Sequence, residues 1–173
     1  MIAAQINRLT EQFPKEVTLV AVSKTKPISA LEEAYNAGHR DFGENKVQEL
    51  CQKAEAMSSE IRWHMIGHLQ RNKVKYIAGF VDLIHGVDNL KLLKEINKQG
   101  LKNDRVINCL IQIKIATEDS KFGMSINEAK KLITSEEFKK RSKRRSEAKK
   151  CISITRALIS FGFETWIALE PGK

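Results

Sequence analysis

The residue with the clearest chemical potential is Lys24, which directly follows the apolar run at residues 17–22 and Ser23. Val-Thr-Leu-Val-Ala-Val is typical of a buried strand, and α/β proteins place functional groups at the carboxyl ends of their strands. Partial burial and the nearby cation Lys26 both favour the neutral amine that a Schiff base needs. The alternative is a lysine that merely extends its charged end into solvent, and the residue pattern alone favours that alternative.

Polar residues follow two further predicted strands in the same way. Glu44 and Asn45 come after residues 40–43, where Gly43 permits a tight turn into the next helix. They could face a ligand, although capping of that helix is an equally good explanation. Lys121 lies in the polar stretch Asp-Ser-Lys-Phe-Gly, which follows the fifth predicted strand.

The histidines and cysteines do not have metal-site spacing. His64 and His68 are four residues apart, but His64 falls on a predicted strand, and the glutamate of a zinc-protease motif is missing. His39 and His85 look isolated. The three cysteines are widely spaced, without Cys-x-x-Cys, so we expect reduced, buried thiols and no metal.

The elements that must position these residues alternate along the chain. Apolar, β-branched runs predict strands at residues 17–22, 40–43, 62–66, 81–85 and 106–115. Helical patterns cover residues 1–13, 27–38, 45–57, 69–78, 88–99 and 126–138, with Asp88 as a cap and Gly100 as a helix end. Five strand–helix units predict an α/β fold, either an open doubly wound sheet or a (β/α)8 barrel.

The net charge of +9 is concentrated near one end of the chain. Residues 139–173 hold ten of the 30 Lys/Arg residues and only three of the 21 Asp/Glu residues. We expect the basic stretch 139–150 to be a solvated segment, since it lacks the interleaved aromatics that favour binding to nucleic acid. The chain has no apolar stretch long enough for a membrane span and no signal-peptide pattern, which indicates a cytoplasmic protein.

Four blocks of residues resemble one known family in order and spacing. The first block is Ala-Val-Ser-Lys-Thr-Lys-Pro at 21–27, and the second is Phe-Gly-Glu-Asn at 42–45 with Val-Gln-Glu at 47–49. The third is Trp-His-Met-Ile-Gly at 63–67 with Leu-Gln at 69–70 and Asn-Lys at 72–73, and the fourth is Ser-Lys-x-Gly at 120–123. Together they resemble the pyridoxal phosphate homeostasis proteins over roughly residues 1–138.

This resemblance implies a fold and a cofactor. The fold would be the fold-type III barrel of the alanine racemase N-terminal domain, a (β/α)8 TIM-like barrel of which about five of eight βα units are recognisable. Lys24 would hold pyridoxal 5′-phosphate (PLP) as a Schiff base. The other candidate cofactor-binding residues are Lys26, Asn45, His64 and Lys121.

The resemblance also implies a role. Such a protein binds PLP without turnover, is a monomer or weak dimer, and serves vitamin B6 homeostasis, with PLP-accepting apo-enzymes as candidate partners. A racemase-like enzyme is the less favoured alternative, because a second catalytic base and a β-domain are missing.

The resemblance ends near residue 138, and residues 139–173 form a divergent tail, first basic and then apolar. The family's later Gly-Leu-Met strand, Ser-x-Gly-Met-Ser block and final Arg-Ile-Gly strand are missing, and no further strand is expected in the tail. We therefore expect a truncated or frameshifted member of the family. The alternative is a non-functional fragment of low thermal stability, with unpaired strand edges.

Overall fold

The computed structural model describes residues 2–14, 17–114, 123–134 and 152–159 of the 173-residue chain. Its strands form one parallel sheet with neighbours in sequence order, from β1 to β6. The strands are β1 (Ala21–Val22), β2 (Asp41–Glu44), β3 (Arg62–Met65), β4 (Leu83–Val87), β5 (Ile107–Ile113) and β6 (Ile152–Ile159). The helices are α1 (Ile2–Gln12), α2 (Ile28–Asn36), α3 (Val47–Ala56), η1 (Arg71–Lys73), α4 (Val74–Ile77), α5 (Leu90–Lys102) and α6 (Ile126–Thr134).

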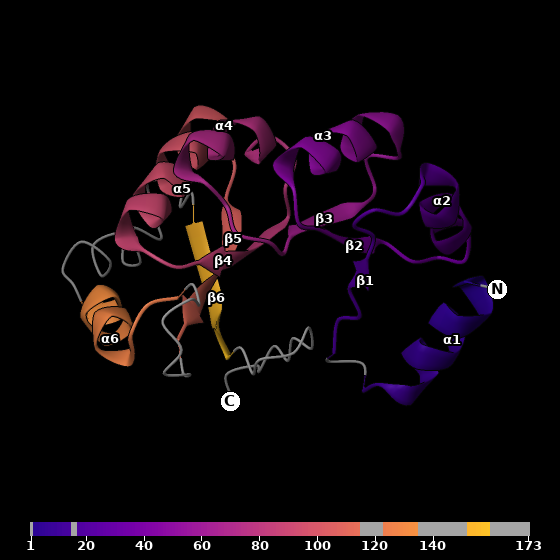
Figure 1. Ribbon diagram of the computed structural model, residues 1–173, viewed down its shortest axis with the longest axis horizontal. Coiled ribbons are helices and arrows are strands. Elements are labelled where there is room, and N and C mark those ends of the chain that lie inside the picture. The colour runs from indigo at the N-terminus through magenta and orange to yellow at the C-terminus, as the bar shows by residue number, and fades with distance from the viewer. Residues whose placement is uncertain (1, 15–16, 115–122, 135–151, 160–173) are drawn as a thin grey trace.

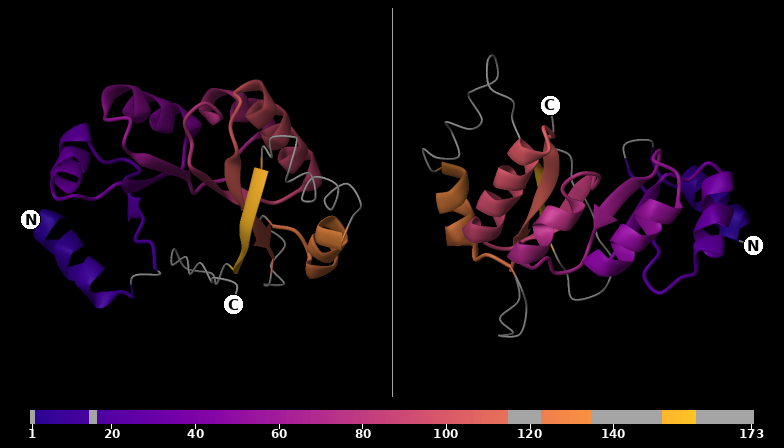
Figure 2. Two further views of the ribbon diagram at one scale, coloured as in Figure 1. Left: turned by 180° about the vertical axis from the view of Figure 1, so that it is seen from behind. Right: turned by 90° about the horizontal axis from the view of Figure 1, so that it is seen from above.

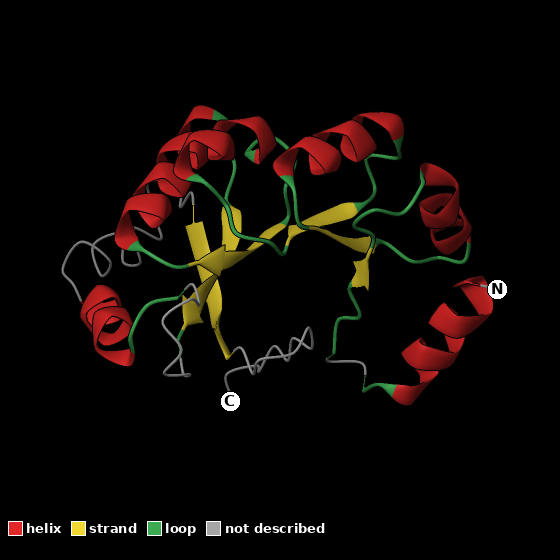
Figure 3. Cartoon of the chain, in the orientation of Figure 1, coloured by secondary structure: helices red, strands yellow, loops and turns green. Residues whose placement is uncertain are grey.

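The strand order confirms the barrel that the family resemblance implies, and it excludes the doubly wound sheet that the pattern of strands and helices left open. A doubly wound sheet reverses its strand order at a switch point and carries helices on both faces. Here the order never reverses, the sheet curves like an arch, and α2 to α5 lie along its outer side (Figure 1). The same separation of an inner sheet from an outer helical layer is seen from behind in Figure 2 (left), and Figure 3 marks it in the orientation of Figure 1, with helices red and strands yellow. The fold is an incomplete TIM-like barrel.

The core lies between the sheet and the outer helices. Phe42 and Trp63 are register partners on β2 and β3, and their ring centroids are 5.9 Å apart. Leu31 of α2 and Leu50 of α3 belong to the same buried cluster. Because side chains alternate along a strand, Asp41 and His64 lie on the opposite, inner face of the sheet.

Two strands differ from the sequence-based expectation. The predicted strand at residues 17–22 is reduced to Ala21–Val22, and both Val17 and Val22 are about half exposed. This strand is at the edge of the sheet and pairs only with β2, so fewer of its residues find a partner. The expectation of no further strand was wrong, because Ile152–Ile159 forms β6 beside β5. Its Ile-Ser-Ile-Thr sequence suits a sheet, and pairing satisfies the backbone edge of β5.

The helix boundaries also show three differences. The helix predicted at residues 69–78 is only the short pair η1 and α4. Asn89, rather than Asp88, caps α5, because its Oδ1 accepts a 2.8 Å hydrogen bond from the Leu92 amide. Gly100 does not end that helix but lies buried within its last turns. The amphipathic helix predicted at residues 1–13 is confirmed as α1.

Candidate functional site

Lys24 lies in a tight turn directly after β1, at the carboxyl edge of the sheet. The turn is closed by the Lys26 amide, which donates a 3.0 Å hydrogen bond to the Ser23 carbonyl. Thr25 has a φ of 63°, in the left-handed region that β-branched residues rarely adopt. Such a conformation costs about 1–2 kcal/mol and must be held by surrounding contacts.

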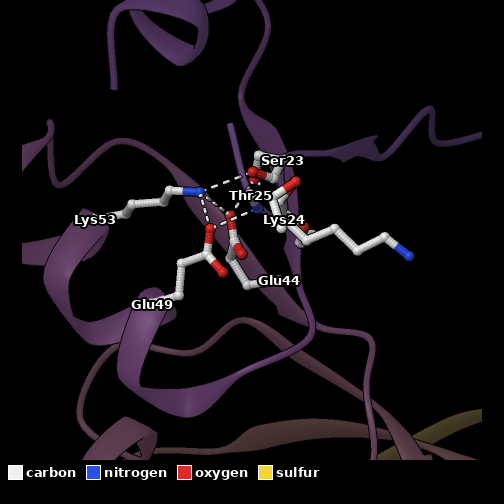
Figure 4. Close-up of polar contacts among 7 residues, drawn as sticks. Ser23, Lys24, Thr25, Glu44, Glu49 and Lys53 are labelled. Atoms are coloured by element: carbon white, nitrogen blue, oxygen red, sulfur yellow. Dashed lines mark hydrogen bonds and ion pairs between the residues drawn. The ribbon is translucent and has the colours of Figure 1, made fainter. Parts of the chain in front are cut away.

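Those contacts come from a group of side chains that we call the Lys53 cluster, made of Ser23, Thr25, Glu44, Glu49 and Lys53 (Figure 4). The Lys53 ammonium donates to the Ser23 carbonyl oxygen, to Glu44 Oε1 and to Glu49 Oε1, each at 2.7 Å. The Thr25 amide donates to Glu49 Oε1 at 2.7 Å, and Ser23 Oγ donates to Glu44 Oε1 at 2.6 Å. Ser23 and Thr25, the two residues that flank Lys24, thus both belong to this cluster.

The central charges of the cluster are buried. The side chain of Lys53 is 6% exposed and that of Glu44 is fully buried, so their charges must compensate each other. The second Glu44 oxygen, Oε2, has no hydrogen-bond partner in the part of the chain that the structure describes. The hydrogen bond from Lys53 lowers the pKa of the Glu49 carboxyl, and the Thr25 amide contributes in the same direction.

The turn after β3 brings two backbones together at the same edge of the sheet. A Cβ atom placed on Gly67 would lie 2.4 Å from the Asn45 carbonyl oxygen and 2.8 Å from the Asn45 Cα. Only glycine allows this approach. Gly67 therefore lets its turn pack directly against the backbone of Asn45, which follows β2 in the sequence.

A chain of polar side chains crosses the inner face of the sheet below this edge. Asp41 Oδ1 lies 3.1 Å from His64 Nε2, and His64 Nδ1 lies 3.0 Å from His85 Nε2. Burial raises the pKa of Asp41, but hydrogen bonds from His64 and Arg62 outweigh it and lower the pKa to about 2. The carboxylate is therefore an acceptor at neutral pH, which places a proton on His64 Nε2. Burial, and secondarily the charge of His64, lowers the pKa of His85 to about 3.

The structure distributes the predicted site residues unevenly. Lys24 is half-buried, Lys26 is exposed in the same turn, and Asn45 is half-buried at the end of β2. His64 is buried in the middle of the inner face, with both ring nitrogens within hydrogen-bond distance of other side chains. Lys121 lies outside the described residues.

Several residues around the site were missed from the sequence. His85 had appeared isolated, and this was wrong, because it contacts His64. Glu49 and Lys53 are four apart on a helix, as in an ordinary surface ion pair. One signal was available: Lys53 falls on the same helix face as Leu50 and Ala54, where an apolar residue is expected.

Comparison with known proteins agrees with this architecture. Residues 1–143 match the family model described as the alanine racemase N-terminal domain. The chain belongs to this family.

Curated relatives match a shorter part of the chain. The pyridoxal phosphate homeostasis protein of Escherichia coli strain K12 is 44% identical over 123 residues, covering 69% of this chain and 53% of the relative. The protein of the same name from Aquifex aeolicus is 43% identical over 115 residues, covering 66% of this chain and 50% of the relative. The chain thus spans about half the length of the curated relatives that it matches.

Solved structures give a consistent picture of the fold. PipY of Synechococcus elongatus, in its form with PLP bound, superposes with a TM-score of 0.78 at 29% identity, covering 91% of this chain and 69% of PipY. The alanine racemase of Bartonella henselae superposes with a TM-score of 0.62 at 17% identity, covering 80% of this chain and 39% of the racemase. The second match supports the fold alone.

Proposed function

We propose that this chain binds PLP covalently through Lys24, in a role in PLP homeostasis. The single observation that carries the proposal is the place of Lys24: a half-buried lysine at the carboxyl edge of β1, on a turn that a buried cluster holds. The similarity to PipY, which has been solved with PLP bound, supports the same assignment.

The residues of the turn fit such a cofactor. In Figure 4 the Lys24 side chain extends away from the Lys53 cluster, so its amine does not point at the buried carboxylates. Lys24 Nζ would form a C=N bond with the aldehyde carbon, and the aldehyde oxygen would leave as water. Bound PLP supplies an electrophilic carbon and an anionic phosphate. Lys26, Asn45, His64 and Lys121 are our candidates for its non-covalent contacts.

The proposal extends to the chain as a whole. We assign cofactor binding to residues 1–138, the part of the chain that resembles the family. We propose binding without substrate turnover, in the cytoplasm, as a monomer or weak dimer that exchanges PLP with apo-enzymes. Among the helices that the structure describes, none is long and apolar enough to cross a membrane.

Trapping chemistry tests the proposal. The full chain is titrated with PLP, the visible absorption band is followed, and the product is reduced with borohydride and mapped by mass spectrometry. We expect one major adduct on Lys24 and none in Lys24→Ala, whereas Lys91→Ala, which removes an exposed lysine of α5, behaves like the wild type. Labelling spread over surface lysines, or equal labelling of Lys24→Ala, would refute the assignment.

A further inference from the structure

We propose that Glu49 is a positioning residue for Lys24, acting through the backbone of the turn and not on the amine itself. The inference rests on the proposed function, because it concerns how the PLP-binding lysine is held. Glu49 belongs to α3, whereas Lys24 follows β1, so the contact joins two elements that lie side by side at the carboxyl edge of the sheet.

The first step concerns the turn. Ser23 and Lys26 close it, Lys24 and Thr25 are its central residues, and a positive φ at the second central residue normally requires glycine or asparagine. Threonine there does not maintain the turn by its own preference. Within the turn, Thr25 Oγ1 donates a 2.6 Å hydrogen bond to the Lys24 carbonyl. From outside the turn, the Thr25 peptide is held by the 2.7 Å hydrogen bond from its amide to Glu49 Oε1.

The second step concerns the anchoring of Glu49. Its carboxylate is fixed by Lys53, whose three ammonium hydrogens match the three acceptors Ser23 O, Glu44 Oε1 and Glu49 Oε1. One ammonium thus holds the carbonyl before Lys24 and, through Glu49, the amide after it. Both peptide groups of Lys24 are restrained by the same buried charge.

The third step concerns direction. In Figure 4 the Lys24 side chain leaves the turn on the side away from Glu49, Glu44 and Lys53. The cluster can therefore orient the Cα–Cβ bond of Lys24 without pairing with its amine. Pre-orientation of this kind raises the rate at which a group reacts, because the geometry is fixed before the encounter.

Glu49 suits a test better than Lys53 does. The Glu49 side chain is 23% exposed, and its truncation leaves the buried pair of Lys53 and Glu44 intact. Loss of Lys53 would instead leave the fully buried Glu44 carboxylate without its cation. Glu49→Ala removes the acceptor of the Thr25 amide. Glu49→Gln keeps an oxygen acceptor without the charge. Glu55→Ala removes an exposed glutamate of the same helix and is the matched control.

The first measurement needs no cofactor. Amide hydrogen exchange is followed by NMR on the ¹⁵N-labelled full chain. In Glu49→Ala we expect the Thr25 amide to exchange about tenfold faster, since it loses a hydrogen bond to a charged acceptor. Glu49→Gln should recover most of the protection, and Glu55→Ala should match the wild type. An unchanged Thr25 exchange rate in Glu49→Ala overturns the proposal.

The second measurement follows PLP capture at Lys24 by borohydride trapping at short times. We expect the initial rate in Glu49→Ala to fall about tenfold, with the melting temperature close to that of Glu55→Ala. A normal capture rate despite lost Thr25 protection also overturns the proposal. The wild-type chain could also capture no PLP at Lys24 while Glu49 still protects the Thr25 amide from exchange. The proposed function and the positioning role would then both fail, and only the hydrogen bond between Thr25 and Glu49 would remain established.

Discussion

The Nδ1 atom of His64 lies 3.0 Å from the Nε2 atom of His85, on the inner face of the sheet. Both rings are buried, so placing a positive charge on both rings at once would cost much free energy. Burial and the neighbouring His64 hold the pKa of His85 at about 3, against about 6.5 for an exposed imidazole.

This arrangement predicts acid sensitivity. Between pH 6.5 and 3 the unfolded chain binds a proton at His85 that the folded chain does not. Above pH 6.5 His85 is neutral in both states, so its titration does not reduce the free energy of unfolding. As the pH drops from 6.5 toward 3, the free energy of unfolding falls by about 1.4 kcal/mol per pH unit. Denaturant unfolding from pH 7 to pH 4 should show this slope, and His85→Gln should reduce it. His68→Gln, which replaces a ring that is 40% exposed, is the control. A slope in His85→Gln equal to that of the wild type would show that His85 does not cause the acid sensitivity.

A second prediction concerns the buried charge of Lys53. Lys53→Met leaves the fully buried Glu44 carboxylate without its cation, and we expect a loss of about 3–5 kcal/mol in the free energy of unfolding. Glu44→Gln in the same chain should recover part of this loss, because it removes the stranded charge. Lys91→Met, on the exposed side of α5, should change stability by less than about 0.5 kcal/mol. Urea unfolding of the four proteins measures the difference.

The fold was predictable where burial sets the pattern. Strands β2 to β5 fall within or close to their predicted ranges. Each contains an apolar residue that is buried in the core, namely Phe42, Trp63, Ile84 and Ile111, and such residues mark the strands in the sequence. The βα rhythm alone did not predict the order of the strands, since the same rhythm suits an open sheet and a barrel; the family resemblance was needed to predict the barrel. The sixth strand was missed, because a short apolar run after a long basic segment carries no information on which edge it will join.

The site was predictable only in part. The position of Lys24 follows from its place after an apolar strand. The cluster around it does not, because Ser23, Glu44 and Lys53 belong to different segments of the chain and meet only when β1, β2 and α3 are packed together. The contact of His64 with His85 joins neighbouring strands in the same way.

A third prediction uses the two turn glycines Gly67 and Gly79. Gly67→Ala puts a methyl group 2.4 Å from the Asn45 carbonyl oxygen, a backbone atom that cannot turn aside as a side chain can. We expect about 1–3 kcal/mol of destabilisation and a weaker PLP band, since Asn45 must move. At Gly79 the nearest atom to an added Cβ is 3.5 Å away, so Gly79→Ala should melt within a few degrees of the wild type. Equal melting temperatures for the two variants would show that the two turns are not packed as described.

The last prediction concerns Cys109, which lies in β5 and is fully buried. Burial raises the pKa of its thiol to about 12, so almost no thiolate exists at pH 8 and no reagent can reach it in the folded chain. Cys51 is only half-buried, and burial raises the pKa of its thiol as well, with the neighbouring Glu55 adding to the effect. Alkylation at pH 8, mapped residue by residue by mass spectrometry, should modify Cys51 slowly in the native chain. Cys109 should be modified only at the rate of unfolding, so its labelling should follow urea concentration in parallel with the loss of secondary structure. Labelling of Cys109 that precedes this loss would mean that the β5 side of the core opens separately.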